Sequence, residues 1–264
     1  MKYLRIDDIG SSTKEFNIYG KNTINIGKRT ISFPSFLSNF LFIKKLPLLT
    51  GWARYRELNY DEWINIIKIL KEKNAKLNIA ITACWVEKDG SLIKFNKKFP
   101  EQTEIIKYGV NEKIFYILNH GLTHCIPGRH LPLRFKSVQK FHREFTNFLP
   151  LEKQYMHLRE SQSIMEEIFG EKPKILVPPG NMFNEDTLIS MQKLNLRIIQ
   201  CQRNLAHQPN DKILKKYDIK HIDNTKNIEV IHDKDIVKDY NFLKNFIKNK
   251  YLENSESFEH FISE

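Results

Sequence analysis

The chain has 264 residues, and 42 Lys and Arg against 31 Asp and Glu give it a formal net charge of +11. Its hydrophobic content of 41% excludes a disordered chain, and its length suits one large domain that needs no disulfides. The cysteines Cys84, Cys125 and Cys201 are odd in number and lie in no CxxC spacing, which argues against a disulfide framework or a Cys-rich zinc module. We therefore expect a reducing compartment.

Hydropathy argues against insertion into a membrane and against export. No run of 18 apolar residues occurs, and lysines and prolines interrupt the most apolar stretch, residues 33–49. Residues 1–10 lack the long apolar core of a secretory signal. The expected location is the cytoplasm.

The positive charge indicates anionic partners, which include nucleic acid, anionic lipid and acidic glycans. The lysines are spread along the chain, and we find no dense basic block with interleaved aromatic residues and no helix-turn-helix or RNA-binding signature. The charge therefore predicts a solvated Lys-rich surface. Nucleic acid is not an expected partner.

The N-terminal quarter begins with one clear strand. Residues 3–6 form a short apolar run that ends at Asp7-Asp8. Residues 11–30 are rich in Ser, Thr, Asn, Gly and Lys, which predicts loop. Residues 31–58 give mixed signals, so we interpret 11–58 as a long loop or lid region.

From Tyr60 onward, helical spacing and short apolar runs alternate. In chain order we expect a helix capped by Asp61, a strand at 77–83, a helix at 100–108, a strand at 114–118, a helix at 151–169 closed by Gly170, a strand at 175–177, a helix at 184–194 capped by Asn184, strands at 196–201, 219–222 and 229–231, and a helix at 240–251 that opens a C-terminal segment, 240–264. The alternation favours an α/β fold with a mainly parallel sheet of about seven strands. With no internal repeat and no linker, residues 1–264 should form a single domain.

Three strand ends carry polar side chains of the right kind for chemistry, and in parallel α/β folds functional residues gather at these ends. Asp7 and Asp8 are adjacent, and adjacent residues face opposite ways along a strand unless it breaks. His120 and His124 have the i, i+4 spacing that places two side chains on one face of a helical turn. His232 follows the last strand.

Two histidines and one carboxylate leave open positions on a zinc-like ion, which is typical of a catalytic metal site. Such a metal lowers the pKa of its bound water and polarises a carbonyl. A second carboxylate as base and a histidine as acid would complete a hydrolase. The segment Val177–Asn181 is a stiff turn suited to the wall of a pocket.

The sequence resembles the polysaccharide deacetylases, also called the NodB-homology or carbohydrate esterase 4 family. Four motifs occur in the family's order between about residues 3 and 235, and they are Asp7-Asp8, His120-x3-His124, Pro178-Pro179-Gly180 and His232-Asp233. The resemblance implies a distorted (β/α)7 barrel and metal-dependent removal of an acyl group from an N-acyl amino sugar.

The resemblance also implies a role for each matching residue. Asp7 would be the general base. Asp8, His120 and His124 would bind a divalent metal, with zinc as first choice and cobalt, nickel or manganese as alternatives. His232 would protonate the leaving amine. The sugar would lie against the turn formed by Pro178, Pro179, Gly180 and Asn181.

The chain departs from the family pattern at three positions. Ile9 separates the Asp pair from Gly10, Gly121 stands where the family has Ser or Thr, and Val177 stands where the family has an Arg that pairs with the base. Arg5 lies two residues before Asp7, so the two side chains should share a face of the strand. We expect Arg5 to supply the missing cation and to keep Asp7 ionised.

The favoured hypothesis is an N-deacetylase that acts on a precursor of a surface polysaccharide or lipopolysaccharide. This precursor would be linked to a lipid or nucleotide carrier. Peripheral association of the protein with an anionic membrane is an option. A deformylase on the same fold stays open. The alternatives are a catalytically impaired glycan-binding pseudoenzyme and, on charge alone, a nucleic-acid-binding protein. Trp52 and Trp85 are candidates for stacking on a sugar ring.

Overall fold

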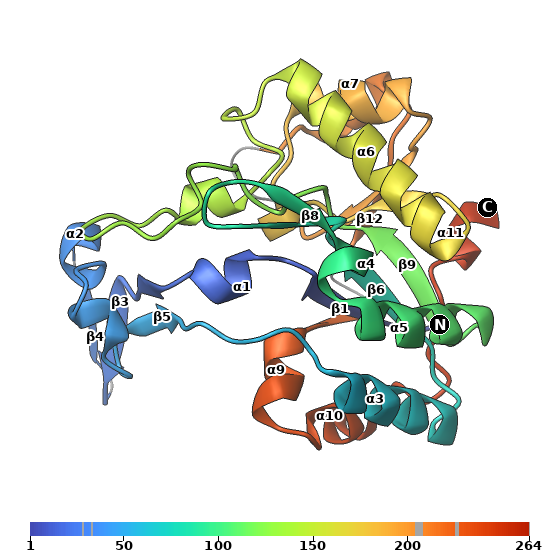
Figure 1. Cartoon of the computed structure of the whole chain (residues 1–264), viewed down its shortest axis with the longest axis horizontal. Coiled ribbons are helices and arrows are strands. Elements are labelled where there is room, and N and C mark those ends of the chain that lie inside the picture. Colours follow the sequence, from blue (N-terminus) through green and yellow to red (C-terminus); the bar gives the residue numbers. More distant parts are fainter. Residues whose placement is uncertain (28, 33, 204–207, 225–226, 264) are drawn as a thin grey trace.

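A curled sheet of parallel strands organises the molecule, which we describe from a computed structural model covering residues 1–27, 29–32, 34–203, 208–224 and 227–263 (Figure 1). The sheet has seven strands in the order β12-β11-β10-β9-β6-β1-β13, and every pairing is parallel. The strands are β1 (Tyr3–Ile9), β6 (Leu77–Ile81), β9 (Phe115–Asn119), β10 (Ile175–Leu176), β11 (Ile198–Cys201), β12 (Lys220–Asp223) and β13 (Ile228–His232). The expected α/β fold, a distorted seven-stranded barrel, is confirmed as an open half-barrel.

Helices follow most of the sheet strands. The longer ones are α3 (Tyr60–Glu72), α5 (Pro100–Asn111), α6 (Leu151–Phe169), α7 (Glu185–Lys193), α8 (Asp211–Lys216), α9 (Asp233–Lys238) and α10 (Phe242–Lys250). Short helices are α1 (Thr13–Phe16), α2 (Ser35–Ser38), α4 (Phe95–Lys98) and α11 (His260–Ser263). Single 3₁₀ turns occupy Ile43–Lys45, Gln139–His142 and Pro179–Asn181.

Small antiparallel pairs of strands lie outside the seven-stranded sheet. They are β2 (Tyr19–Gly20) with β5 (Thr50–Trp52), β3 (Thr23–Ile26) with β4 (Arg29–Ser32), and β7 (Cys84–Val86) with β8 (Leu92–Lys94). Residues 11–30, for which we expected loop, thus contain α1, β2, β3 and part of β4. Lys28 and Phe33 in the predicted lid region, and Glu264 at the end of the predicted tail, lie outside the described residues.

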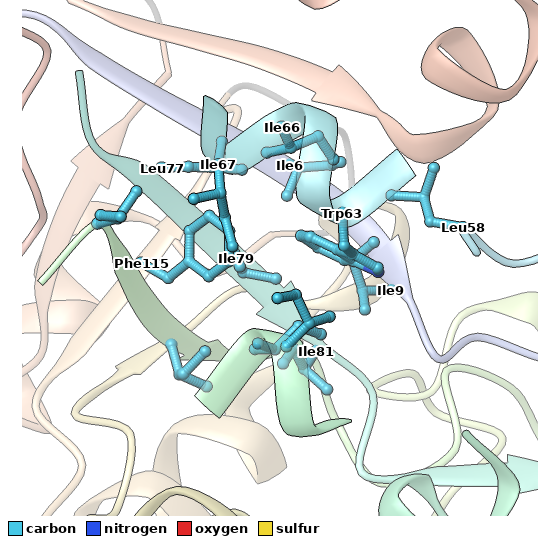
Figure 2. Packing of buried hydrophobic residues seen from close by; sticks show 14 of the residues in the cluster. Ile6, Ile9, Leu58, Trp63, Ile66, Ile67, Leu77, Ile79, Ile81 and Phe115 are labelled. Atoms are coloured by element: carbon cyan, nitrogen blue, oxygen red, sulfur yellow. The ribbon is translucent and has the colours of Figure 1, made fainter. Parts of the chain in front are cut away.

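The largest core lies between the outer face of the sheet and its helices (Figure 2). Trp63 of α3 is fully buried, and its ring meets Phe115 of β9 edge-on at a centroid distance of 5.6 Å. Burying one such side chain contributes about 1.5–3 kcal/mol. The N-cap of α3 is Asn59, whose side chain accepts from the backbone N–H of Glu62, so the prediction that Asp61 caps this helix is wrong.

The inner face of the sheet holds a second apolar cluster, and the C-terminal segment closes it at one end. Phe258 is fully buried there beside Tyr3, and its backbone N–H donates to Asn78 Oδ1 at 2.6 Å. Tyr3 begins β1 and Ile228 begins β13, so this apolar cluster lies at the end of the sheet where the strands start. The opposite end, where the strands finish, is left for polar side chains.

No helix among the described residues combines the length and apolarity that crossing a membrane requires.

Candidate metal and catalytic site

The end of β1 presents two adjacent carboxylates to one site because the strand is distorted there. Asp8 has a φ of +71°, and the pairing register between β1 and β6 shifts between Ile6 and Ile9. The regular alternation of side chains is therefore interrupted between Asp7 and Ile9. Asp7 keeps the face that it shares with Arg5 and contacts it, whereas the distortion lets Asp8 contact the histidines at the same site.

The two histidines follow β9 and converge on Asp8. Asp8 Oδ1 lies 3.4 Å from His120 Nε2 and 3.0 Å from His124 Nε2. Each of these three side chains offers one ligand atom, and the three atoms lie within 4.8 Å of one another. All three residues are buried.

The helical turn predicted for the His pair is wrong. Residues 120–124 form an irregular loop, with φ of +85° at Gly121 and +60° at His124. The pair meets because these left-handed residues turn the chain back on itself. A left-handed residue other than glycine is strained, and such strain persists where surrounding contacts hold it, often at functional sites.

Hydrogen bonds favour charged forms at this cluster. Burial opposes ionisation of Asp8, but its contacts with His120 and His124 outweigh that cost and hold its pKa well below the ordinary value. Burial likewise opposes protonation of His120, but the contact with Asp8 and the charges of Asp7 and Asp8 raise the pKa of that imidazole. A cation is therefore stabilised at this point, whether it is a proton or a metal ion.

The donor set fits a divalent metal. Metal-bound histidines commonly use their second nitrogen for an orienting hydrogen bond. His120 Nδ1 lies 2.7 Å from the carbonyl oxygen of Val177, which leaves Nε2 for the ligand position. His124 Nε2 is buried, and Asp8 Oδ1, the third atom of the cluster, lies 3.0 Å from it, so this nitrogen also points to the ligand position. One carboxylate and two imidazoles suit zinc and also cobalt, nickel or manganese.

Arg5 and Asp7 form a buried bidentate pair on the inner face of β1. Arg5 Nε donates to Asp7 Oδ1 at 2.7 Å, and Nη2 donates to Oδ2 at 2.6 Å. Arg5 is 1% exposed. A bidentate guanidinium fixes the carboxylate plane as well as its charge. Val177, which stands at the family's Arg position, contributes its backbone carbonyl to His120 instead.

A cavity of about 160 Å³ opens over this cluster. It brings together the Asp pair, the His pair, His232 and part of the Pro-Gly turn. Pro179 is buried behind that turn. The lining residues are Asp7, Asp8, Thr13, Asn17, Tyr19, Trp52, His120, His124, Gln139, His142, Arg143, Pro178, Gly180, Asn181 and His232.

His232 reaches the cavity from the edge strand β13. It pairs in register with Asp7 across the β1–β13 ladder, so the expected base and acid are neighbours on adjacent strands. Trp52 also lines the cavity, whereas Trp85 is buried between Phe16 and Phe99. Of the two candidates for sugar stacking, Trp52 alone lies at the cavity.

Glu144, which no sequence pattern singled out, supports the loop of the second histidine. Its fully buried carboxylate accepts from three consecutive backbone N–H groups, those of Leu122, Thr123 and His124, at 3.1, 3.2 and 2.9 Å. His157 Nδ1 lies 2.6 Å from Glu144 Oε1, the oxygen that also accepts from the backbone N–H of Leu122. No local motif marks Glu144, because it lies in an irregular segment 20 residues beyond His124.

A second missed feature is a buried ion cluster behind the cavity. Lys14 of α1 is fully buried and donates to Glu57 Oε2 at 2.8 Å and to Asp233 Oδ2. Glu57 Oε2 also accepts from the backbone N–H of Gly10. Burial raises the pKa of Asp233 to about 7, although the Lys14 charge opposes that shift. The cluster joins the turn after β1 to the start of α9, next to His232.

Replacing Lys14 by Met should destabilise the protein by about 3–5 kcal/mol, because it leaves two buried carboxylates without their cation. The measurement is the free energy of unfolding in urea. The control is Lys71→Met, which breaks an exposed pair with Glu112 and should change stability little. Equal effects of the two substitutions would contradict the structural role of the buried cluster.

Comparison with known proteins adds a family match and a set of similar folds. A family model described as polysaccharide deacetylase matches residues 58–199, more than half of the chain. No curated protein matches the sequence of this chain. The matched segment includes His120 and His124, whereas Asp7, Asp8 and His232 lie outside it.

Solved structures with a similar fold share little sequence identity with this chain, and three of them serve as examples. A family 4 acetyl xylan esterase from Clostridium thermocellum, in complex with a cobalt ion, is 10% identical over 74% of this chain and 81% of that one, with a TM-score of 0.43. A family 4 carbohydrate esterase from Bacillus anthracis is 15% identical over 78% of each chain, with a TM-score of 0.45. A family 4 pseudoenzyme from the same organism is 12% identical over 91% and 88%, also with a TM-score of 0.45.

Proposed function

Because the chain belongs to the polysaccharide deacetylase family, we propose that it is a metal-dependent hydrolase that removes an N-acyl group, most simply an acetyl group, from an amino sugar. The observation that carries this proposal is the convergence of Asp8, His120 and His124 at a cavity that also exposes Asp7 and His232. The substrate would be a precursor of a surface polysaccharide or lipopolysaccharide, on a lipid or nucleotide carrier. The three free, buried cysteines support a reducing, cytoplasmic setting.

Each residue of the cavity has a defined part in the proposed reaction. Asp8, His120 and His124 would hold a divalent ion, which supplies a polarised acyl carbonyl and a water of lowered pKa. Asp7 takes the proton of the attacking water, because Arg5 holds its carboxylate in one orientation. His232, which lines the same cavity, would give a proton to the leaving nitrogen, so that the C–N bond breaks and acetate and a free amine are released.

Binding of the sugar would involve the polar and aromatic walls of the cavity. Trp52, Pro178, Gly180 and Asn181 line the cavity, and the Trp52 ring, with Lys234 Nζ 4.2 Å from its centroid, would contact the sugar. The Asn181 side chain is itself held, because its Oδ1 accepts from the backbone N–H of Gln202 at 3.1 Å. These contacts do not separate an acetyl from a formyl group, so both acyl groups belong in the substrate screen.

Metal content is the first test. We expect one divalent ion per chain in the wild type, and its loss in the double variant Asp8→Ala/His120→Ala, because two of the three ligands are then gone. Elemental analysis gives the stoichiometry, and circular dichroism shows that the variant is folded. A wild type that stays metal-free after soaking in zinc would overturn the hydrolase proposal.

Amine release from N-acetyl and N-formyl amino sugars is the second readout on the same samples. Metal bound without amine release from any sugar tested would favour the alternative, a glycan-binding pseudoenzyme. Metal bound with amine release only from the formyl compounds would make the protein a deformylase of the same mechanism.

A further inference from the structure

One end of the molecule carries large apolar side chains that are exposed among cations. Phe36, Phe42 and Leu48 are 63%, 69% and 80% exposed. They belong to a group that we call the distal surface, which consists of Ile26, Ile31, Phe36, Leu37, Phe42, Leu46, Leu48, Leu131, Leu133 and Phe135. Exposed apolar patches of this extent mark interaction sites.

Two chain segments build the distal surface, and they contact each other. Residues 23–48 include the β3–β4 pair and α2, and residues 131–135 belong to the loop that reaches α2 in Figure 1. Lys44 Nζ donates to the carbonyl oxygen of Leu133 at 3.0 Å, and the rings of Phe40 and Phe135 lie 5.2 Å apart. The two segments therefore contact each other at this end of the molecule.

The charge of this face has a single sign. Residues 16–56 contain seven Lys and Arg and no Asp or Glu, and residues 126–143 contain five Lys and Arg and no Asp or Glu. The exposed cations next to the apolar side chains include Arg29, Lys45, Arg54, Arg134 and Lys136. Elsewhere the chain mixes both signs, since all 31 acidic residues lie outside these two segments.

We propose that the distal surface docks on an anionic lipid bilayer. Exposed Phe and Leu side chains partition into the boundary between head groups and acyl chains, and Lys and Arg stay at the level of the lipid phosphates. The negative potential of an anionic leaflet attracts such cations. A second copy of this chain is a poor occupant, because two acid-free basic faces repel each other.

The same segments frame the opening of the cavity over the metal site. Asn17, Tyr19 and Trp52 lie in the acid-free range 16–56, and Gln139 and Arg143 lie in the acid-free range 126–143. A molecule docked through the distal surface would hold this cavity close to the membrane. The docking proposal rests on the proposed function only where it connects the membrane to the cavity, because that connection requires an amino-sugar substrate carried on a membrane lipid.

Vesicle sedimentation tests the docking directly. We expect the full-length protein to pellet with vesicles of phosphatidylcholine and phosphatidylglycerol, and much less with phosphatidylcholine alone. The charge reversal Arg134→Glu/Lys136→Glu should weaken binding at least tenfold, since each cation removed at the surface costs about a fivefold loss. The apolar variant Phe42→Ser/Leu48→Ser should also weaken it at least tenfold, because two partitioning side chains are gone.

Matched control variants lie on other faces. Leu92→Ser/Tyr240→Ser removes exposed apolar side chains from β8 and from the segment before α10, and Lys244→Glu/Lys248→Glu reverses exposed charges on α10. Both should bind vesicles like the wild type. Equal loss in control and distal variants, or no pelleting of the wild type with anionic vesicles, would overturn the docking proposal.

Further readouts separate the other occupants and the proposed function. Concentration-dependent dimers in light scattering that disappear in Phe42→Ser/Leu48→Ser would assign the surface to a second copy instead. Binding to an oligonucleotide as tight as to anionic vesicles, and unaffected by Phe42→Ser/Leu48→Ser, would reduce the surface to a general polyanion site. Amine release by the wild type from a water-soluble N-acetyl amino sugar, measured without vesicles, tests the hydrolase proposal alone.

Discussion

Asp7→Asn is expected to lower kcat by about 10²–10⁴-fold and to leave the bound metal in place. An amide is isosteric with the carboxylate but cannot accept the proton of the attacking water, and proton transfer by a positioned side chain contributes about that factor. Asp7 is not one of the three clustered ligands, so metal content should match that of the wild type. Rates of amine release and elemental analysis on the same sample measure both quantities.

Two results would contradict this role of Asp7. Wild-type turnover in Asp7→Asn would mean that another group is the base, and loss of the metal would make Asp7 a ligand. Asp235→Asn is a suitable control, because that carboxylate caps the start of α9 through the backbone N–H of His232 and does not line the cavity.

Arg5 acts through Asp7 in the proposed reaction, so its substitution should lower the rate and leave the metal in place. Arg5→Ala removes the bidentate partner that fixes the plane of the Asp7 carboxylate, and we expect a lower kcat/KM with wild-type metal content. Arg5→Lys keeps the charge but loses the bidentate geometry, so it should restore kcat/KM only in part. An unchanged kcat/KM in Arg5→Ala would remove Arg5 from the mechanism.

The regular elements could be predicted because their signals are local. The limits expected for α6, residues 151–169, match the structure, and Gly170 ends the helix in the left-handed conformation at φ +89°. Asn184 caps α7 as expected. The buried strands follow from short apolar runs, and the alternation of strands and helices alone leads to the parallel sheet.

The gathering of the candidate site residues could be anticipated because parallel strands end at one edge of the sheet. Asp7, Asp8, His120 and His232 lie at or just after the ends of β1, β9 and β13, and all four line one cavity. The contact between Arg5 and Asp7 follows from the two-residue period of the strand. The chemical roles of these residues stay predictions until the variants are measured.

The remaining features depend on contacts between distant segments, which no local pattern reports. Lys14 lies in a polar stretch that predicts loop, yet it is fully buried because Glu57 and Asp233 enclose it from 43 and 219 residues away. The short strands within residues 11–58 lack the alternation of a half-buried sheet, because several of their apolar residues are exposed.

Glu144 explains one departure from the family pattern and leads to the second large prediction. A Cβ on Gly121 would lie 2.1 Å from Glu144 Oε2, so the Ser or Thr that the family has at this position would collide with the carboxylate. Gly121 also has a φ of +85°, which side chains disfavour. In this chain, therefore, Glu144 holds the loop of His124 from outside, and Gly121 leaves the space that it needs.

Glu144→Ala should destabilise the protein by about 3 kcal/mol or more, because it leaves three buried backbone N–H groups without an acceptor, each at a cost of about 1–3 kcal/mol. Glu144→Gln, which keeps the size and one carbonyl oxygen, should remain folded and bind metal about 10–100-fold more weakly, as expected when a group that supports a metal ligand is altered. Urea unfolding and titration with zinc measure the two effects.

The metal affinity of folded variants separates positioning of His124 from mere stability. Gly121→Ala should lower zinc affinity as Glu144→Gln does, because it displaces the same carboxylate from the other side. Glu160→Gln on the exposed face of α6 is the control and should leave both zinc affinity and stability unchanged. If Glu144→Gln bound zinc like the wild type while losing stability, the carboxylate would support the fold of the loop but not the geometry of the metal ligand.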